Sequence, residues 1–153
     1  LNNLDQWLQK ATAYAEQKKF EADVLAQARL APDQFALVQQ VQSACDAAKF
    51  CVARLAGMEA PKFDDTESSL ADLRERIRKT VHFVSSVEAT RIDGSDAREI
   101  VVPRRDGSIT LSGEAYLKQF ALPNFFFHLT TAYALLRHNG VELGKADYLG
   151  PLP

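Results

Sequence analysis

Hydrophobic residues recur every three or four positions over most of this chain, and this spacing is typical of amphipathic helices. The repeat predicts four long helices and one short turn of helix, which cover 4–19, 21–27, 32–56, 67–87 and about 113–139. Pro32 suits the first position of a helix because its missing N–H needs no partner there, and Gly57 suits a position just past a helix end. Pro123 lies inside the last helix and predicts a kink or a separate first turn.

Between residues 91 and 113 the hydrophobic period shortens from the helical value to two, which predicts β-strands over 99–103 and 108–111. The Asp106-Gly107 pair between them supplies the positive backbone angles of a tight hairpin turn. An isolated two-stranded hairpin is only marginally stable, so we expect it to lie against the helices or a partner. The sequence therefore predicts an all-α protein, an antiparallel four-helix bundle with a small β-hairpin between helices 3 and 4.

The second predicted helix has an apolar face and a polar flank. The residues expected in the core are Phe35, Val38, Val41, Cys45, Ala48, Val52 and Leu55. The residues expected on the polar flank are Gln39, Gln42, Ser43, Asp46 and Lys49, where Asp46 and Lys49 form a weak surface pair. The loop over 58–66 ends in Asp64, Asp65 and Thr66, whose short oxygen-bearing side chains favour an N-cap for the third helix.

The length of 153 residues fits a single domain covering 1–153, with enough chain to bury a hydrophobic core. Hydrophobic residues make up 46% and charged residues 25% of the sequence, as in an ordinary globular protein. Apolar runs fall well short of the roughly 20 residues of a membrane helix, so we expect no membrane insertion. The net charge of −2 gives no general attraction to phosphates, which argues against nucleic-acid binding.

Cys45 and Cys51 lie on one predicted helix, ~9 Å apart along its axis, which is too far for a disulfide between them. Free thiols favour a reducing compartment, and we expect a cytoplasmic protein. The segment over 1–18 shows helical spacing and not the pattern of a signal peptide. Because the chain starts at Leu1 without an initiator Met, we expect that further residues precede it.

The last predicted helix carries a polar stripe, which is the best candidate for a functional site. Its members are Asn124, His128, Thr131, Leu135 and His138, at alternating spacings of four and three. His128 has two interpretations: a metal ligand or general base that faces the bundle interior, or a half-buried histidine bonded to Asp46, a threonine hydroxyl or water. We expect His138 to cap the end of the helix and His82 to lie at the surface of the third helix.

Five segments of the chain carry a resemblance to a known group of proteins. They are Ala28-Arg-Leu-Ala-Pro-Asp33, Gln42-Ser-Ala-Cys-Asp46, Arg54-Leu-Ala-Gly57, Phe120-Ala-Leu-Pro-Asn-Phe-Phe-Phe-His128 and Leu136-Arg-His-Asn-Gly-Val-Glu-Leu-Gly144. These segments resemble a bacterial family of unknown function within the DinB/YfiT-like superfamily, which includes metal-dependent enzymes. The resemblance covers nearly the whole chain and implies the DinB-like four-helix bundle.

The resemblance also implies a metal centre, whose ligands this chain keeps only in part. Members with a metal carry one histidine on the second long helix and a His-x-x-x-His pair on the fourth, which coordinate a divalent ion such as zinc or nickel. Here Asn124 and His128 occupy the positions of the pair, and Asp46 is the nearest candidate on the second helix. Since zinc favours nitrogen and sulfur ligands, this set is weaker, so His128 and Asp46 are ligands only if a metal binds at all.

Two functions, one non-enzymatic and one enzymatic, follow from these observations. The first is a binding or assembly module without a permanent metal, which holds a small molecule. The second is a divergent metal-dependent transferase or hydrolase, with thiols among its substrates and His128 at its site. In either case the expected pocket residues are Gln42, Asp46, Asn124, His128 and Thr131. Because Phe125, Phe126 and Phe127 point around most of the helix, at least one faces outward, which predicts a homodimer contact.

Overall fold

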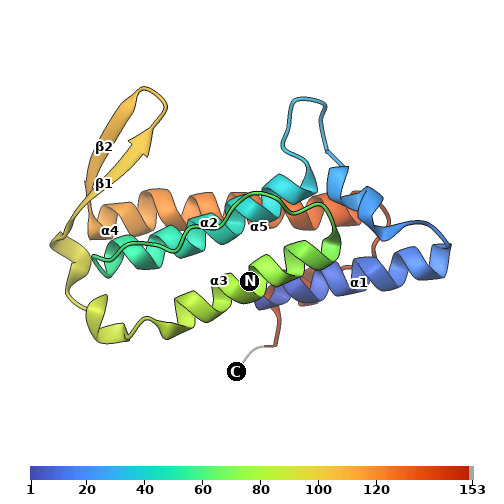
Figure 1. Cartoon of the computed structure of the whole chain (residues 1–153), viewed down its shortest axis with the longest axis horizontal. Coiled ribbons are helices and arrows are strands. Elements are labelled where there is room, and N and C mark those ends of the chain that lie inside the picture. Colours follow the sequence, from blue (N-terminus) through green and yellow to red (C-terminus); the bar gives the residue numbers. More distant parts are fainter. Residues whose placement is uncertain (152–153) are drawn as a thin grey trace.

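The structure is a computed structural model that describes residues 1–151. Within this range four long helices form the body of the molecule (Figure 1). They are α1 (Asn2–Lys18), α2 (Leu37–Leu55), α3 (Leu70–Ser86) and α5 (Leu122–His138). Both α1 and α2 pack on α3 and on α5, so the four helices enclose one core. The predicted mostly helical fold is therefore confirmed.

Side chains from all four long helices form the core. Its largest fully buried members are Leu4, Trp7, Leu8, Leu37, Val41, Leu70, Leu73, Ile77, Leu135 and Leu136. The Trp7 ring stacks on Tyr148 and meets Tyr133 edge-on, with ring centroids 5.5 Å apart in both pairs. The indole N–H of Trp7 donates to the carbonyl of Asp147 at 2.9 Å. Trp7 thus fastens the short C-terminal helix α6 (Lys145–Leu149) to α1.

Helix α2 begins at Leu37, five residues later than the predicted start at Pro32. Pro32 lies in a turn that is closed by a hydrogen bond from the Gln34 N–H to the Ala31 carbonyl at 3.1 Å. The fixed φ of proline suits the second position of a β-turn as well as the start of a helix, and here the turn forms. Phe35 consequently lies before the helix and is exposed, so its predicted place in the core is wrong.

The remaining predicted core positions of α2 are divided between full and partial burial. Val38, Val41, Cys45 and Leu55 are buried, whereas Ala48 and Val52 are half-buried. The short 3₁₀ turn Ala22–Gln27 packs on the same helix. Helix α3 begins at Leu70, because Ser69 and Asp72 form a capping box: the Asp72 N–H donates to the Ser69 hydroxyl at 3.0 Å. The predicted N-cap at 64–66 therefore lies too early.

Strands β1 (Glu99–Arg104) and β2 (Gly107–Ser112) form the predicted antiparallel hairpin. Arg104 pairs with Gly107, so the tip consists of Arg105 and Asp106, and the glycine lies one position later than predicted. Ile100 and Val102 pack with Leu55, Tyr116 and Ala121 at one end of the helices. The hairpin is thus covered on one face by the helices, as a two-stranded sheet requires. Figure 1 shows its tip projecting beyond them.

The last long helical segment is interrupted just before Pro123. It starts as α4 (Gly113–Ala115), continues as a π-helix over Tyr116–Ala121 and becomes α5 at Leu122. Proline lacks the N–H that would bond to the carbonyl four residues earlier, and the wider π turn accommodates this missing bond. The predicted separate first turn is present, in the form of the π-helix.

Candidate functional site

A cavity of about 240 Å³ lies between α2, the α4–α5 segment and the hairpin. Its lining residues are Ser43, Asp46, Ala47, Phe50, Arg54, Val102, Pro103, Tyr116, Phe120, Ala121, Asn124 and His128. The lining is mixed, with apolar side chains from all three elements and a few polar groups that converge on the same space. This composition is typical of small-molecule sites, where apolar walls supply affinity and a few polar groups fix orientation.

His128 is held at this cavity by Gln40, a residue outside the predicted pocket. Its Nδ1 lies 2.8 Å from Oε1 of Gln40 on α2, and the Gln40 side chain is 2% exposed. The Gln40 amide nitrogen donates to the Phe35 carbonyl at 3.3 Å, so Oε1 is the group that faces the imidazole. An amide oxygen only accepts, and therefore the Nδ1 nitrogen of His128 carries the proton.

The other nitrogen of His128 remains available to a ligand. Within residues 1–151, Nε2 makes no hydrogen bond. Burial lowers the pKa of His128 below its ordinary value, so the imidazole is neutral at pH 7. A neutral imidazole with Nδ1 bonded presents an Nε2 lone pair, which accepts a hydrogen bond or a proton. The expected partners of His128, Asp46 or a threonine hydroxyl, are replaced by Gln40.

The opposite end of the cavity contains Arg54 and Tyr116. Arg54 Nη1 donates to the Tyr116 hydroxyl at 3.1 Å, and its guanidinium lies 5.0 Å from the centre of the Phe50 ring. Tyr116 is almost fully buried, and burial raises the pKa of its hydroxyl, although the hydrogen bond from Arg54 opposes this. In the described part of the chain Arg54 forms no ion pair. It is therefore a cation whose charge no carboxylate of these residues neutralises.

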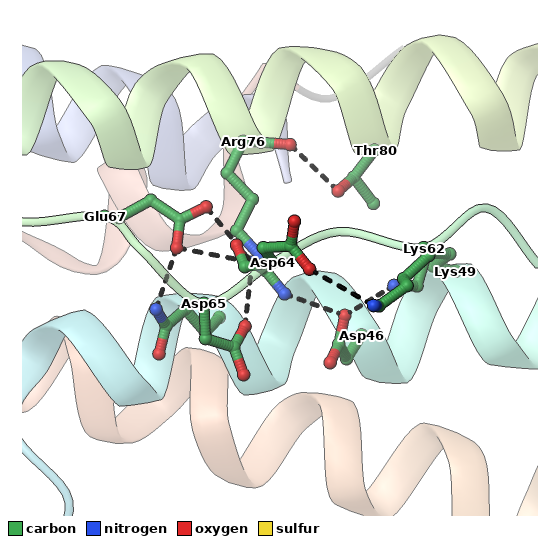
Figure 2. Close-up of polar contacts among 9 residues, drawn as sticks. Asp46, Lys49, Lys62, Asp64, Asp65, Glu67, Arg76 and Thr80 are labelled. Atoms are coloured by element: carbon green, nitrogen blue, oxygen red, sulfur yellow. Dashed lines mark hydrogen bonds and ion pairs between the residues drawn. The ribbon is translucent and has the colours of Figure 1, made fainter.

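Asp46 lines the cavity but also belongs to a buried ion cluster on the other side of α2 (Figure 2). Its Oδ1 lies 3.0 Å from Nη2 of Arg76 and 2.9 Å from Nζ of Lys49. Lys49 is buried, so its predicted surface position is wrong: the Phe50 and Phe63 rings cover its ammonium group. Asp46 is thus a structural anion that is shared by two cations.

Arg76 is the centre of this ion cluster. Its side chain is 1% exposed, and Nη1 lies 3.1 Å from Oε1 of Glu67 and 2.9 Å from Oδ1 of Asp65. Burial alone would lower the pKa of Arg76, but the hydrogen bond from its guanidinium to Glu67 and the nearby carboxylates outweigh burial and raise it. The cluster ties the loop over 59–69 to α2 and α3, as Figure 2 shows.

The other predicted site residues have different places. Asn124 lines the cavity with Asp46 and His128. The Gln42 side chain donates to Oε2 of Glu67 at 2.8 Å and is not among the cavity residues. The Thr131 hydroxyl donates to the carbonyl of Phe127 one turn earlier at 2.7 Å, and it also lies outside the lining. The structure therefore brings three of the five predicted pocket residues to one cavity.

The remaining histidines lie away from the cavity. His82 is exposed on α3, as expected. His138 is exposed in the last turn of α5, where the Asn139 side chain, and not His138, donates to the Leu135 carbonyl at 2.8 Å. The predicted capping role therefore belongs to Asn139.

The residues at the cavity do not fit the three-imidazole metal site that the resemblance implied. His128 offers a single nitrogen, Asp46 is engaged by two cations, and Asn124 supplies a neutral amide, which is a weak ligand. Among residues 1–151, no group of three His, Cys, Asp or Glu side chains is placed to hold a metal ion. The donor set thus argues against tight binding of zinc or nickel here.

The fold defines a class of protein, the DinB-like helical proteins. The chain is similar to a DinB family member protein from Shewanella denitrificans, whose crystal structure matches it with a TM-score of 0.93. The two chains are 47% identical, and the match covers 99% of this chain and 86% of that chain. The sequence profile described as Domain of unknown function (DUF1993) matches residues 1–149, and the chain therefore belongs to this family. No curated protein matches the chain.

In the described residues, no helix has both the length and the apolar character that a membrane span requires.

Proposed function

We propose that this protein is a binding module for a small molecule, which occupies the cavity between α2 and α5 and contacts His128. The observation that carries the proposal is the pair Gln40–His128. A buried amide fixes one tautomer of the imidazole and leaves Nε2 free at a cavity with apolar walls. Fixing the orientation of the imidazole costs side-chain entropy. An oriented Nε2 acceptor at a cavity is what the binding of a ligand requires, and this supports the proposal.

We also infer that the four long helices form an antiparallel four-helix bundle and that the chain is a single domain of this type. The mutual packing of α1, α2, α3 and α5 supports the bundle. The Arg54–Tyr116 and Gln40–His128 hydrogen bonds support the antiparallel direction of α2 and the α4–α5 segment, because the residue numbers run in opposite senses along the two. Such bundles build their ligand sites from side chains on facing helices, as this cavity does.

A second candidate function is a transferase or hydrolase in which His128 acts as a general base. The lowered pKa of His128 supports it, because a base must be unprotonated at neutral pH before it can take a proton from a substrate. Since the donor set does not fit a metal site, this candidate involves the imidazole alone. The thiols are not candidates for the nucleophile: burial raises the pKa of Cys45 to about 11 and also raises the pKa of Cys51.

The proposal includes a cytoplasmic location and a homodimer. Cys45 and Cys51 are both free, which suits a reducing compartment. Leu122, Phe126 and Phe127 are large apolar side chains that are exposed near the start of α5, and such a group suits a contact with a second copy. Sedimentation velocity tests the dimer: Phe127→Glu should convert a dimer to a monomer, whereas a native chain that is already monomeric would contradict this part of the proposal.

The binding function is tested with an uncharged probe that fits an apolar cavity, 3-phenylpropanamide, added to isotope-labelled protein and followed by NMR. We expect the signals of Ala47, Phe120 and His128 to shift. The variant Ala47→Phe fills the cavity and should abolish these shifts, whereas Ala71→Phe, on the exposed face of α3, should bind as the native chain does. Shifts that are scattered over the surface, or that persist in Ala47→Phe, would refute a ligand site in this cavity.

Metal content distinguishes the proposal from a permanently metal-bound protein. Mass spectrometry is done on protein purified without an affinity tag, with His128→Ala as the comparison. We expect substoichiometric metal in both and no change in melting temperature when zinc or nickel is added. Near-stoichiometric metal that is lost in His128→Ala would contradict the argument from the donor set.

A further inference from the structure

The cavity has two chemically different ends, and each end is marked by a hydrogen bond across it. Gln40 on α2 contacts His128 at 2.8 Å, and Arg54 on α2 contacts Tyr116 at 3.1 Å. Gln40 and Arg54 lie near opposite ends of α2, so the imidazole and the guanidinium mark the two ends of the cavity.

The guanidinium of Arg54 is oriented by its neighbours and only partly used by them. The aromatic rings of Phe50 and Tyr116 lie 5.0 and 5.7 Å from its central carbon, within the range of cation–π attraction. A guanidinium has five N–H donors, and the Tyr116 hydroxyl accepts from Nη1. Within residues 1–151 no carboxylate pairs with Arg54. The guanidinium plane is thus preorganised at the cavity, and N–H groups other than the one bonded to Tyr116 can donate to a ligand.

In the described residues Arg54 neither binds the free carbonyls at the end of α2 nor pairs with a carboxylate. A cation near the end of a helix often binds the free carbonyls, but at the end of α2 Arg98 donates to the Leu55 carbonyl. Asp46 is the acidic residue of the cavity lining, and it is ~12 Å from Arg54 along the axis of α2 and is engaged by Lys49 and Arg76. The Arg54 end of the cavity therefore carries a positive charge.

We propose that this end of the cavity binds the carboxylate of an organic acid, with Arg54 as the anchor and the apolar walls around the hydrocarbon part of the acid. The inference rests on the proposed binding function and gives its ligand a chemical class. Arginine matches the two oxygens of a carboxylate with two parallel hydrogen bonds. Between the two ends, Phe50, Phe120 and Val102 provide the apolar surface for an aliphatic or aromatic body.

The test compares two probes of nearly the same shape, 3-phenylpropanoate and 3-phenylpropanamide, in which a charged carboxylate is replaced by a neutral amide, by NMR titration of the full chain at fixed ionic strength. We expect the carboxylate to bind at least about tenfold more tightly than the amide, since a hydrogen bond to a charged group contributes roughly 1.5–3 kcal/mol. Arg54→Gln should remove this difference, because the glutamine side chain is uncharged.

The outcomes separate this inference from the proposed function. Equal affinities for the two probes in the native chain, with shifts at the cavity, overturn the carboxylate site but not the binding module. A preference for the carboxylate that persists in Arg54→Gln likewise overturns Arg54 as the anchor. If neither probe shifts the cavity signals, the proposed function itself fails. Because the first comparison needs only the native chain, the result does not depend on whether Arg54→Gln folds.

Discussion

Removal of the Arg76 guanidinium should destabilise the protein more than any other single change in its ion cluster. Arg76→Met keeps most of the buried aliphatic stem and removes the charge, so Glu67, which is 12% exposed, loses its cationic partner. Breaking a fully buried ion pair costs about 3–5 kcal/mol. Because Asp46 is 33% exposed and keeps Lys49, we expect a smaller loss of about 2–4 kcal/mol in the free energy of unfolding.

The burial of each carboxylate decides how much its loss should cost. Asp65 is 64% exposed, and Asp65→Asn should cost less than about 1 kcal/mol, as exposed pairs do. Glu67→Gln should lie between Asp65→Asn and Arg76→Met, at roughly 1–2 kcal/mol, because the amide keeps one hydrogen bond from Arg76. The double variant Arg76→Met/Glu67→Gln should be more stable than Arg76→Met alone, since it leaves no unpaired carboxylate at Glu67.

Urea unfolding followed by circular dichroism measures these differences, provided that the dependence on urea is the same for all variants. The order of the three single variants is the critical result. If Asp65→Asn is as costly as Glu67→Gln, burial does not set the strength of these pairs. A double variant that is less stable than Arg76→Met would show that the Glu67 carboxylate is not left unpaired, and the reasoning would be refuted.

Two further predictions concern stability. Burial lowers the pKa of His128 in the native chain below its ordinary value of 6.5. As the pH falls through 6.5, the unfolded chain therefore binds more protons than the native chain, and the free energy of unfolding should decrease. A urea series at several pH values against His128→Gln checks this, and a parallel decline in both chains would contradict it. A Cβ at Gly113 would lie 1.9 Å from the carbonyl oxygen of Ser95, so Gly113→Ala should lower the free energy of unfolding by more than about 2 kcal/mol. The nearest neighbour of a Cβ at Gly144 would be 3.9 Å away, so Gly144→Ala should change the free energy of unfolding by less than about 1 kcal/mol in the same assay.

The elements of the fold could be predicted because their hydrophobic periods are strong. The helical repeat at Leu4, Trp7, Leu8 and Ala11 and the change of period around the hairpin both appear in the structure. The start of α2 could not be predicted, because Pro32 is favoured by a β-turn as well as by a helix, and the local sequence does not choose between them. Tertiary contacts decide such cases.

The candidate site could be predicted only in part, because Asp46 was found on α2 but Gln40 and Arg54 were not. His128 and Asn124 were found because α5 is otherwise apolar and a polar stripe stands out on it. Gln40 and Arg54 also lie on α2, where so many residues are polar that no stripe stands out. The signal that could have found Gln40 is its place one turn before the buried Ala44, on the small-residue face that packs against α5.

Lys49 and Asp46 show why charge pairs are difficult to place from sequence. Their spacing of three residues predicts a weak surface pair, and the pair does form, at 2.9 Å. The loop over 59–69 then covers it, and Phe63 lies on the ammonium group. A segment that is distant in sequence and lacks periodicity converts a surface pair into a buried one, and local patterns do not contain that information.

The ion cluster and the ligand cavity share Asp46, and this predicts a coupling between them. Arg76 and Lys49 neutralise Asp46; without Arg76, more of its negative charge acts on the cavity. Over the ~12 Å to Arg54, one charge in a water-like medium contributes about 0.3 kcal/mol, so Arg76→Met should weaken binding of 3-phenylpropanoate roughly twofold. Binding of 3-phenylpropanamide should not change, because the probe is uncharged. If Arg76→Met weakens both probes equally, the cluster affects the cavity by its shape and not by its charge.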